Sequence, residues 1–357
     1  MSISSCALPA QNADEGVGVD RASQTSAASA REGVLQIEGA LPLHFGGRLE
    51  GAQIAWRLCG AEGAPVIAAL GGISAGRAVT DLSETQKGWW SDVVGPGRAL
   101  DTTRWRILGM DFLGGSAQST GPRAGQTNFP SMSAYDQADA LRRVIEHLRL
   151  GSVFGVLGAS YGGMVALAFA ERWPALVGRV VVISAAHRAH PMSTAWRSVQ
   201  RALVRYAAER GDGPEGLRLA RALAMATYRT PAEFEARFAG PAVRIDGRFK
   251  FPVESYLLAR GDAYASTYVP EAFVCLSESI DLHSVDPAQI RTPATLVAVR
   301  EDQLVPVADM RTLKEKLAGP AALIELSSLY GHDAFLKESA ALKAVFARAL
   351  EAQGEAR

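Results

Sequence analysis

A serine lies between two glycines in the run Gly158-Ala159-Ser160-Tyr161-Gly162, which fits the pattern G-x-S-x-G. An apolar, strand-like segment (153–157) precedes this run, and a helix-like segment (164–171) follows it. Where a buried strand turns sharply into a helix, side chains other than glycine collide, and the turn lifts the serine hydroxyl to where a histidine can reach it. The pattern alone is weak evidence, because the chain contains 35 glycines. Its position between a strand and a helix predicts that Ser160 is a nucleophile rather than part of a structural turn.

A nucleophilic serine needs a histidine as base and a carboxylate that orients the histidine. When the serine sits at such a turn, the partners follow in the order Ser, Asp, His, each in a loop after a strand. Asp302 follows the strand-like segment 295–299, with Glu301 as the competing carboxylate. Of the six histidines, only His332 follows both Asp302 and the last strand-like segment, 323–326. The order along the chain therefore predicts a Ser160–Asp302–His332 triad.

Acyl transfer from such a serine also needs two backbone N–H groups that stabilise the tetrahedral oxyanion. The first is expected at Tyr161, the residue after the nucleophile. The second is expected from the loop 71–76, which follows the first core strand and is rich in glycine, and the Ile73 amide is the favoured donor. The alternative is that this loop is a simple glycine-rich turn.

Short apolar segments alternate with helix-like segments along most of the chain. Strands are expected at 65–70, 105–110, 153–157, 180–183, 295–299 and 323–326, and helices between several of them, for example at 133–150 and 307–317. Residues 33–60 alternate between apolar and polar side chains, as an antiparallel hairpin would. This alternation predicts a mainly parallel sheet with helices on both faces. Together with the serine motif it predicts the α/β-hydrolase fold.

One interval is too long to be an ordinary connection between strands. Residues 187–290 separate two strand-like segments and contain amphipathic stretches such as 193–209 and 215–228. We interpret 187–290 as an inserted helical cap over a core formed by 34–186 and 291–357. An independent second domain is the less favoured alternative, because the final strands return to the sheet. Residues 1–33 are rich in Ala and Ser and are expected to be a disordered leader.

The composition excludes several classes of protein. The 357 residues include 37 basic and 37 acidic residues, which argues against a nucleic-acid or polybasic membrane-surface binder. Cys6, Cys59 and Cys275 are widely spaced, so neither a disulfide framework nor a metal site is expected. Since no secretory signal or membrane-spanning run is apparent, the sequence predicts a soluble cytoplasmic enzyme.

Several stretches of the sequence resemble one family, the homoserine O-acyltransferases of α/β-hydrolase type. The resemblance spans roughly residues 35–350 and is carried by residues 89–102, 104–105, 119–122, 158–164, 219–221, 227–230, 254–257 and 331–335. It implies acylation of the L-homoserine hydroxyl by acyl-CoA through a ping-pong mechanism, in methionine biosynthesis. It further implies no cofactor apart from acyl-CoA as co-substrate, and a homodimer formed through the cap.

The resemblance also assigns roles to two charged residues. It implies that Arg221 holds the α-carboxylate of the amino-acid acceptor and that Asp333 receives its α-ammonium group. Both roles are physically reasonable, since a guanidinium binds a carboxylate through two parallel hydrogen bonds. Without the resemblance, Arg221 would be interpreted as a solvated residue of a helix.

The chain departs from the family pattern in two loops. Residues 109–118 lack the usual Asn after the strand and the usual Cys before Ser119. The oxyanion loop contains Gly72, Ile73, Ser74 and Ala75, where acetyl-transferring members typically have Ala-Leu-Thr-Gly, so it is expected to influence the choice of acceptor.

A further segment bears on the choice of acyl donor. Residues 196–201 look like a cap segment of a succinyl-transferring subgroup, which implies that Arg197 selects the acyl-CoA. A succinyl donor ends in a carboxylate and needs a cation in an otherwise apolar pocket. The alternative is that Arg197 is an exposed charge on an amphipathic helix.

The sequence thus favours a homoserine O-succinyltransferase over an O-acetyltransferase. It leaves open L-serine as the acceptor, with succinyl-CoA or acetyl-CoA as the donor. A carboxylic-ester hydrolase would use the same triad with water as acceptor, but would have no need for a pair of charges that binds a zwitterion. A catalytically inactive binding protein of this fold is disfavoured, because all three triad positions are filled.

Overall fold

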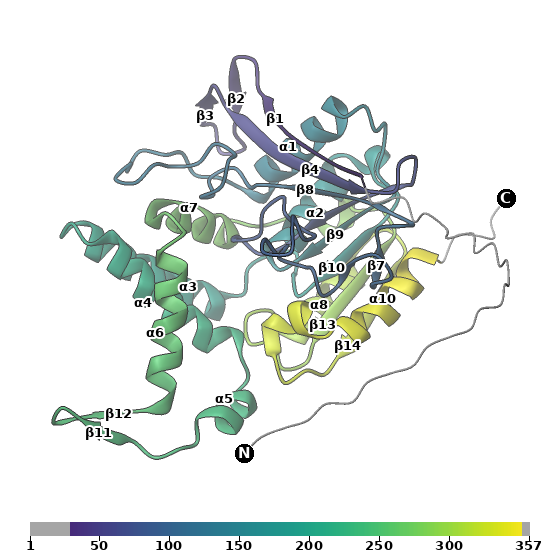
Figure 1. The fold of residues 1–357 in the computed structure, drawn as a ribbon. Helices are drawn as coiled ribbons and strands as arrows, with labels where there is room; N and C mark the ends of the chain where they lie inside the picture. Colours follow the sequence, from purple (N-terminus) through teal and green to yellow (C-terminus); the bar gives the residue numbers. More distant parts are fainter. Residues whose placement is uncertain (1–28, 352–357) are drawn as a thin grey trace, which may run out of the picture.

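An eight-stranded sheet forms the centre of the computed structural model, which describes residues 29–351 (Figure 1). The strands from β8 to the far edge at β14 run parallel, whereas β1 and β4 pair antiparallel with each other and β4 pairs antiparallel with β8. In spatial order the strands are β1 (Ser29–Gln36), β4 (Gln53–Gly60), β8 (Arg106–Met110), β5 (Val66–Leu70), β9 (Gly155–Ala159), β10 (Val180–Ile183), β13 (Ala294–Val299) and β14 (Ala321–Leu326). The predicted mainly parallel sheet of an α/β-hydrolase is confirmed.

Both faces of the sheet are covered, because alternate residues of its central strands pack into two separate cores. On one face, Val66, Ala68 and Leu70 pack in a cluster with α1 (Ala134–His147), α2 (Tyr161–Arg172) and α8 (Val307–Lys316). On the other face, Ile67 and Ala69 pack with residues of the segment 90–100 and of α10 (Ser339–Glu351). The uninterrupted apolar character of these strands follows from burial on both sides.

Several short elements complete the core. They are β2 (Ala40–Pro42), β3 (Arg48–Glu50), β6 (Val94–Gly95), β7 (Leu100–Asp101), α9 (Ala334–Lys337) and the 3-10 helices η1 (Pro174–Leu176), η2 (Pro287–Gln289) and η3 (Gly331–Asp333). Within residues 29–351, no helix combines the length and the apolar character needed to cross a membrane.

The interval 187–290 leaves the core and forms a group of helices beside it (Figure 1). Helix α4 packs against both α3 and α6, and α7 packs against α3. The helices are α3 (Pro191–Ala208), α4 (Gly213–Tyr228), α5 (Pro231–Phe238), α6 (Pro252–Ala265) and α7 (Pro270–Asp281). We refer to residues 187–290 as the cap.

The cap is not purely helical, which differs from the expectation. Strands β11 (Val243–Ile245) and β12 (Arg248–Lys250) form an antiparallel hairpin. Asp246 and Gly247 connect the strands and both have positive φ, at 49° and 80°. An Asp-Gly pair favours this two-residue turn because both positions of the turn require positive φ.

The expected boundary of the leader at residue 33 is wrong. Residues 29–33 belong to β1, and their backbones pair with residues 56–60 of β4. An edge strand is held by backbone hydrogen bonds, so its Ala- and Ser-rich composition does not exclude it from the sheet. The rest of the predicted leader, 1–28, lies outside the described residues.

Candidate active site

Ser160 occupies a strained turn between β9 and α2, with φ 55° and ψ −122°. A Cβ atom added at Gly158 would lie 2.0 Å from the Gly162 carbonyl oxygen, and one added at Gly162 would lie 2.3 Å from the Leu70 carbonyl oxygen. Both glycines are therefore required by close backbone approach. The amide of Ser160 donates to the Ile183 carbonyl at 2.9 Å, which anchors the turn to the neighbouring strand. The local structure presents the serine hydroxyl at the carboxyl end of β9.

The structure brings Ser160, His332 and Asp302 into one hydrogen-bonded line. His332 Nε2 lies 2.8 Å from Ser160 Oγ, and His332 Nδ1 lies 2.7 Å from Asp302 Oδ2. The other carboxylate oxygen of Asp302 accepts the amides of Leu304 and Val305 at 2.8 and 3.1 Å. Because the carboxylate of Asp302 accepts, Nδ1 carries the proton of the neutral imidazole and Nε2 is free to accept the serine proton.

The charges around His332 favour its protonated form. Burial alone would lower the pKa of the imidazole, but the negative charges of Asp302 and Asp333 outweigh that effect and raise the pKa above 6.5. The ring is buried, with Tyr228 at 5.8 Å and Phe335 at 6.1 Å between ring centroids. A histidine in these surroundings can take a proton from the serine and hold it close to the reacting atoms.

Glu301, the competing carboxylate, has different partners. It accepts hydrogen bonds from the Ser327 hydroxyl and the Ser328 amide, the second at 2.8 Å. Glu301 therefore ties the loop after β13 to the start of the loop that carries His332, rather than orienting the imidazole.

The predicted oxyanion loop lies beside the nucleophile. Its Gly71 carbonyl accepts the Gly162 amide at 2.8 Å, which fixes the loop to the start of α2. The Ala75 amide donates to the Gly72 carbonyl at 2.8 Å and closes a β-turn with Ile73 and Ser74 in the middle. Within the described residues, neither the Tyr161 amide nor the Ile73 amide donates a hydrogen bond to the protein. Both amides are thus free to donate to a ligand.

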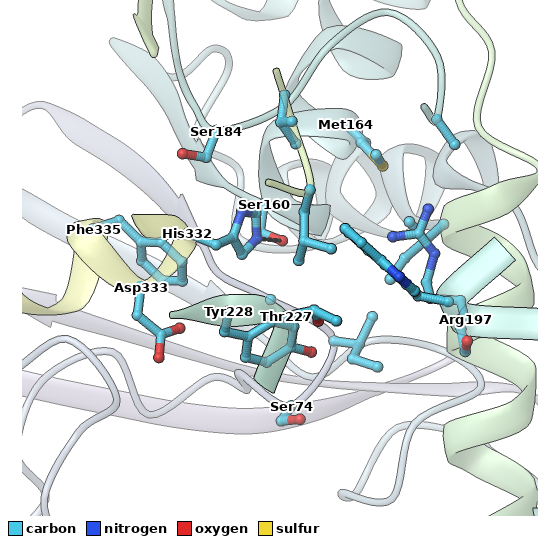
Figure 2. A pocket seen from close by; sticks show the side chains of 18 of the residues that line it. Ser74, Ser160, Met164, Ser184, Arg197, Thr227, Tyr228, His332, Asp333 and Phe335 are labelled. Atoms are coloured by element: carbon cyan, nitrogen blue, oxygen red, sulfur yellow. Dashed lines mark hydrogen bonds between the residues drawn. The ribbon is translucent and has the colours of Figure 1, made fainter. Parts of the chain in front are cut away.

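A cavity of about 220 Å³ opens over the serine (Figure 2). Core and cap residues both line it, and the predicted site residues Arg197, Arg221 and Asp333 are among them. All four residues of the predicted acceptor-specificity loop, Gly72–Ala75, also line this cavity.

Arg221 lies on α4 with its guanidinium over two tyrosine rings. Its Cζ atom is 4.7 Å from the ring centroid of Tyr264 and 5.3 Å from that of Tyr228. Within residues 29–351, no carboxylate lies within ion-pair distance of this guanidinium. Its half-buried charge is therefore available to an anionic group in the cavity.

Asp333 has a partner that the sequence did not indicate. Its Oδ2 lies 3.0 Å from Nε of Arg229, and Nη1 of Arg229 lies 3.2 Å from both carboxylate oxygens of Glu233. All three side chains are buried. Burial raises the pKa of Asp333, although Arg229, His332 and Arg221 counteract part of this effect. Glu233 is also paired with Arg237, whose Nη1 lies 2.9 Å from Oε1 of Glu233, so Asp333 belongs to a network of two carboxylates and two guanidinium groups.

Arg197 is also paired within the protein. Its Nε and Nη2 lie 2.8 and 2.6 Å from Oδ1 of Asp281 on α7. The second carboxylate oxygen of Asp281 lies 2.6 Å from Nη1 of Arg201. Two guanidinium groups therefore share one carboxylate, and this cluster carries one excess positive charge. The side chain of Arg197 is only 12% exposed, unlike an ordinary surface arginine.

The chain is similar to known proteins over most of its length. Residues 82–339 match the model of the alpha/beta hydrolase fold family. A homoserine O-succinyltransferase of Xanthomonas campestris pv. campestris is 40% identical over 99% of this chain and 92% of its own length. A serine O-succinyltransferase of Litchfieldella anticariensis is 33% identical over 85% of this chain and 94% of its own length. The chain belongs to the homoserine O-acyltransferase family of the α/β-hydrolase fold.

A solved structure extends the comparison to the fold alone. Esterase E22 superposes with a TM-score of 0.81 and covers 90% of this chain and 100% of its own, at 18% identity. Since an esterase and a set of acyltransferases share this architecture, the residues of the cavity must decide the acceptor. As a member of this acyltransferase family, the protein is an acyltransferase.

The sequence analysis missed one residue that lines the cavity, Tyr228, and three that contact residues of the cavity wall. Tyr228 stands next to His332 and under Arg221, and it lies within the stretch 227–230 that carried the family resemblance. Asp281, Tyr264 and Tyr268 belong to no motif, and they meet their partners only through the folding of the cap onto the core. Their polar side chains within the cap were the only available signal.

Proposed function

We propose that the protein transfers the succinyl group of succinyl-CoA to the hydroxyl of L-homoserine, forming O-succinyl-L-homoserine and CoA. The observation that carries this proposal is the placement of Arg221 and Asp333 in one cavity with Ser160 and His332. A cation for the α-carboxylate and an anion for the α-ammonium group suit an amino acid better than a simple ester. The name of the relative at 40% identity agrees with this acceptor and donor.

In the first step, Ser160 attacks the thioester carbonyl of succinyl-CoA. His332 takes the hydroxyl proton, and Asp302 stabilises the imidazolium. The amides of Tyr161 and Ile73 stabilise the tetrahedral oxyanion. The carbon–sulfur bond then breaks, and the CoA thiol leaves with the proton from His332. The product of this step is an ester of succinate with Ser160.

In the second step, homoserine binds with its carboxylate on Arg221 and its ammonium group on Asp333. His332 removes the proton of the homoserine hydroxyl, whose oxygen attacks the serine ester. The bond to Ser160 breaks, and the serine recovers its proton from His332. No metal ion or bound cofactor takes part in this scheme. The cap excludes water, because hydrolysis of the ester would waste the succinyl group.

The proposed donor specificity is attributed to Arg197. Its contacts with Asp281 use Nε and Nη2, so Nη1 retains donors for the terminal carboxylate of a succinyl group. The excess positive charge that Arg197 and Arg201 hold beside Asp281 also favours an acyl group that ends in an anion. Acetyl-CoA has no group that would use this charge.

Two further parts of the proposal concern the cellular setting. We propose that the enzyme acts in the cytoplasm, where acyl-CoA is available, and that its product serves methionine biosynthesis.

We also propose a homodimer formed through the cap. Met192, Val199 and Tyr206 support the dimer, because they lie seven residues apart on α3 and are exposed by 54%, 53% and 61%. A seven-residue repeat of exposed apolar side chains is typical of a helix seam that packs against another helix.

Release of CoA thiol tests the reaction directly. Acetyl-CoA and succinyl-CoA would each be incubated with L-homoserine, L-serine or no acceptor, and the fastest pair identifies donor and acceptor together. The proposal expects rapid release only with succinyl-CoA and homoserine. Preference for serine would move the protein to the serine O-succinyltransferases, and sustained release without an acceptor would identify a hydrolase. The Ser160→Ala variant, which lacks the nucleophile, should show no burst of CoA.

A further inference from the structure

Two tyrosines of the cap reach across to the oxyanion loop of the core. Tyr264 lies in the last turn of α6, and Tyr268 follows the end of that helix. The Tyr268 hydroxyl donates to the Ile73 carbonyl at 3.0 Å. The hydroxyls of Tyr264 and Ser74 lie 2.8 Å apart and share a hydrogen bond. The cap therefore contacts the loop through two phenol hydroxyls.

These contacts are made to Ile73 and Ser74, the part of the loop that hydrogen bonds within the loop restrain least. The turn from Gly72 to Ala75 has one internal hydrogen bond, which joins its ends and leaves Ile73 and Ser74 in the middle. The peptide between the two middle residues of a β-turn is the one that rotates when the turn changes type. Tyr268 holds the carbonyl of this peptide, and Tyr264 holds the side chain that follows it. Together they fix the carbonyl side of Ile73. The Ile73 amide, the proposed oxyanion donor, belongs to the preceding peptide and is restrained through the Cα atom that the two peptides share.

The two tyrosines are themselves well anchored. Their rings stack with centroids 4.8 Å apart and 18° between planes, and Phe273 of α7 packs edge-on against Tyr264 at 6.3 Å. The amide of Val269 donates to the Ser116 hydroxyl at 2.8 Å, which ties the residue after Tyr268 to a core loop. Because the stacked pair is anchored at Tyr264 by Phe273 and next to Tyr268 by the Val269 hydrogen bond, it can hold the loop in place rather than follow its movement.

We propose that Tyr268 and Tyr264 are positioning residues that hold the oxyanion loop in its catalytic conformation from the cap side. Neither tyrosine takes part in the chemistry. The inference rests on the part of the proposed function that assigns the Ile73 amide to the oxyanion hole. Arg221 lies over the ring of Tyr264, so the acceptor site and the oxyanion loop share one support. Removal of either hydroxyl should weaken stabilisation of the oxyanion without removing a substrate contact.

The test compares Tyr268→Phe and Tyr264→Phe with wild type and with a matched control, Tyr256→Phe. Tyr256 lies on the same helix, but its ring packs against Phe238 and Arg237, away from the loop. The main measurement is the rate constant for labelling of Ser160 by a fluorophosphonate. In this reaction His332 takes the proton of Ser160, Oγ forms a bond to phosphorus, and the phosphorus–fluorine bond breaks so that fluoride leaves. The phosphoryl oxygen occupies the oxyanion hole. The reaction needs neither CoA nor an amino acid.

We expect Tyr268→Phe to lower the labelling rate constant about tenfold, less than the hundredfold or more expected when an oxyanion donor is lost outright. The kcat for transfer should fall in parallel, with the KM for the acceptor and the melting temperature close to wild type. Tyr256→Phe should leave all of these unchanged. Ser74→Ala and Tyr264→Phe should each slow labelling, and the double variant should be no slower than the worse single variant.

Two results would overturn the inference. One is wild-type labelling in Tyr268→Phe and in Tyr264→Phe. The other is an equal loss in Tyr256→Phe, which would indicate general loosening of the cap. If instead CoA release shows no acceptor dependence while Tyr268→Phe still slows labelling, the proposed transfer reaction fails and the positioning role stands.

Discussion

Asp333 influences His332 through its charge, apart from the substrate contact proposed for it. The pKa of His332 is raised in spite of burial because Asp302 and Asp333 are both negative. The base must be neutral to accept the serine proton, so activity should fall as the pH drops through this pKa. The acid limb of the pH profile should therefore lie above 6.5, the ordinary value of histidine.

Replacing Asp333 by Asn removes one of the two charges that raise the pKa of His332. The acid limb should consequently move to lower pH. The measurement is the pH dependence of the CoA burst from succinyl-CoA without an acceptor, because this half-reaction does not use Asp333 to bind homoserine. Asp309→Asn is the matched control, since Asp309 lines the same cavity but acts electrostatically on His187. An unmoved limb in Asp333→Asn, or one moved to higher pH, would contradict this account.

The proposed role of Arg197 in donor selection can be tested without leaving its partner Asp281 unpaired. Replacing it by Leu leaves Asp281 bonded to Arg201 and Thr194, so the buried carboxylate keeps partners. A charge-assisted hydrogen bond is worth roughly 1.5–3 kcal/mol, which corresponds to a loss of about 10- to 150-fold in kcat/KM for succinyl-CoA. The value for acetyl-CoA should change little, because that donor has no terminal carboxylate.

The control for this variant is Arg205→Leu, which removes an exposed arginine from the same helix. The ratio of kcat/KM for the two donors should shift only in Arg197→Leu. If both variants, or neither of them, alter the ratio, donor selection does not depend on Arg197.

At the scale of elements, the corner between α4 and α5 joins the cap to the two loops that carry Asp302 and His332. Thr230 caps α5 by accepting the Glu233 amide at 3.0 Å and donates its hydroxyl proton to the Leu329 carbonyl at 2.6 Å. Its neighbour Arg229 accepts a hydrogen bond at its carbonyl from the side chain of Gln303 at 3.0 Å. The loops that carry Asp302 and His332 are thus bonded to the same corner.

Thr230→Val should destabilise the protein, because it leaves a helix N-terminus uncapped and a carbonyl without its donor. The expected loss in the free energy of unfolding is about 1–3 kcal/mol. Denaturation in urea measures it, with Thr312→Val as the control. Thr312 donates within the exposed face of α8, and its replacement should cost about 0.5 kcal/mol or less. Equal losses in the two variants would remove the corner from the account of stability.

The strands were predictable because burial on both faces makes them short apolar runs. The segment 180–183 has the bounds of β10, whereas the expected strand 153–157 is observed as β9 at 155–159. The shift arises because Val153 forms only an isolated bridge, to Val177, while the strand continues into the residues of the serine turn. The hairpin in the cap carried a readable signal, Asp246-Gly247 between alternating residues, which the helical interpretation of the interval overlooked.

At the scale of the whole molecule, the sequence predicted those site residues that follow strands in a fixed order. Ser160, Asp302 and His332 are far apart in the chain, yet the topology of the sheet brings the ends of their strands together. The contacts of Tyr268 with Ile73 and of Arg229 with Asp333 follow no such rule, because they depend on how the cap settles on the core. No spacing within the sequence encodes that arrangement.

If the proposed dimer forms through the exposed seam on α3, a single charge placed in that seam should change the oligomeric state. In a two-fold dimer each residue of the seam meets the equivalent region of the other copy, so Val199→Glu would bury two like charges in one interface. Val199 is the middle residue of the seam, and this variant should sediment as a monomer where the wild type sediments as a dimer. Phe45→Glu is the control, because Phe45 is similarly exposed, at 51%, but lies outside the cap. A wild type that sediments as a monomer, or a Val199→Glu dimer as stable as wild type, would exclude this seam as the interface.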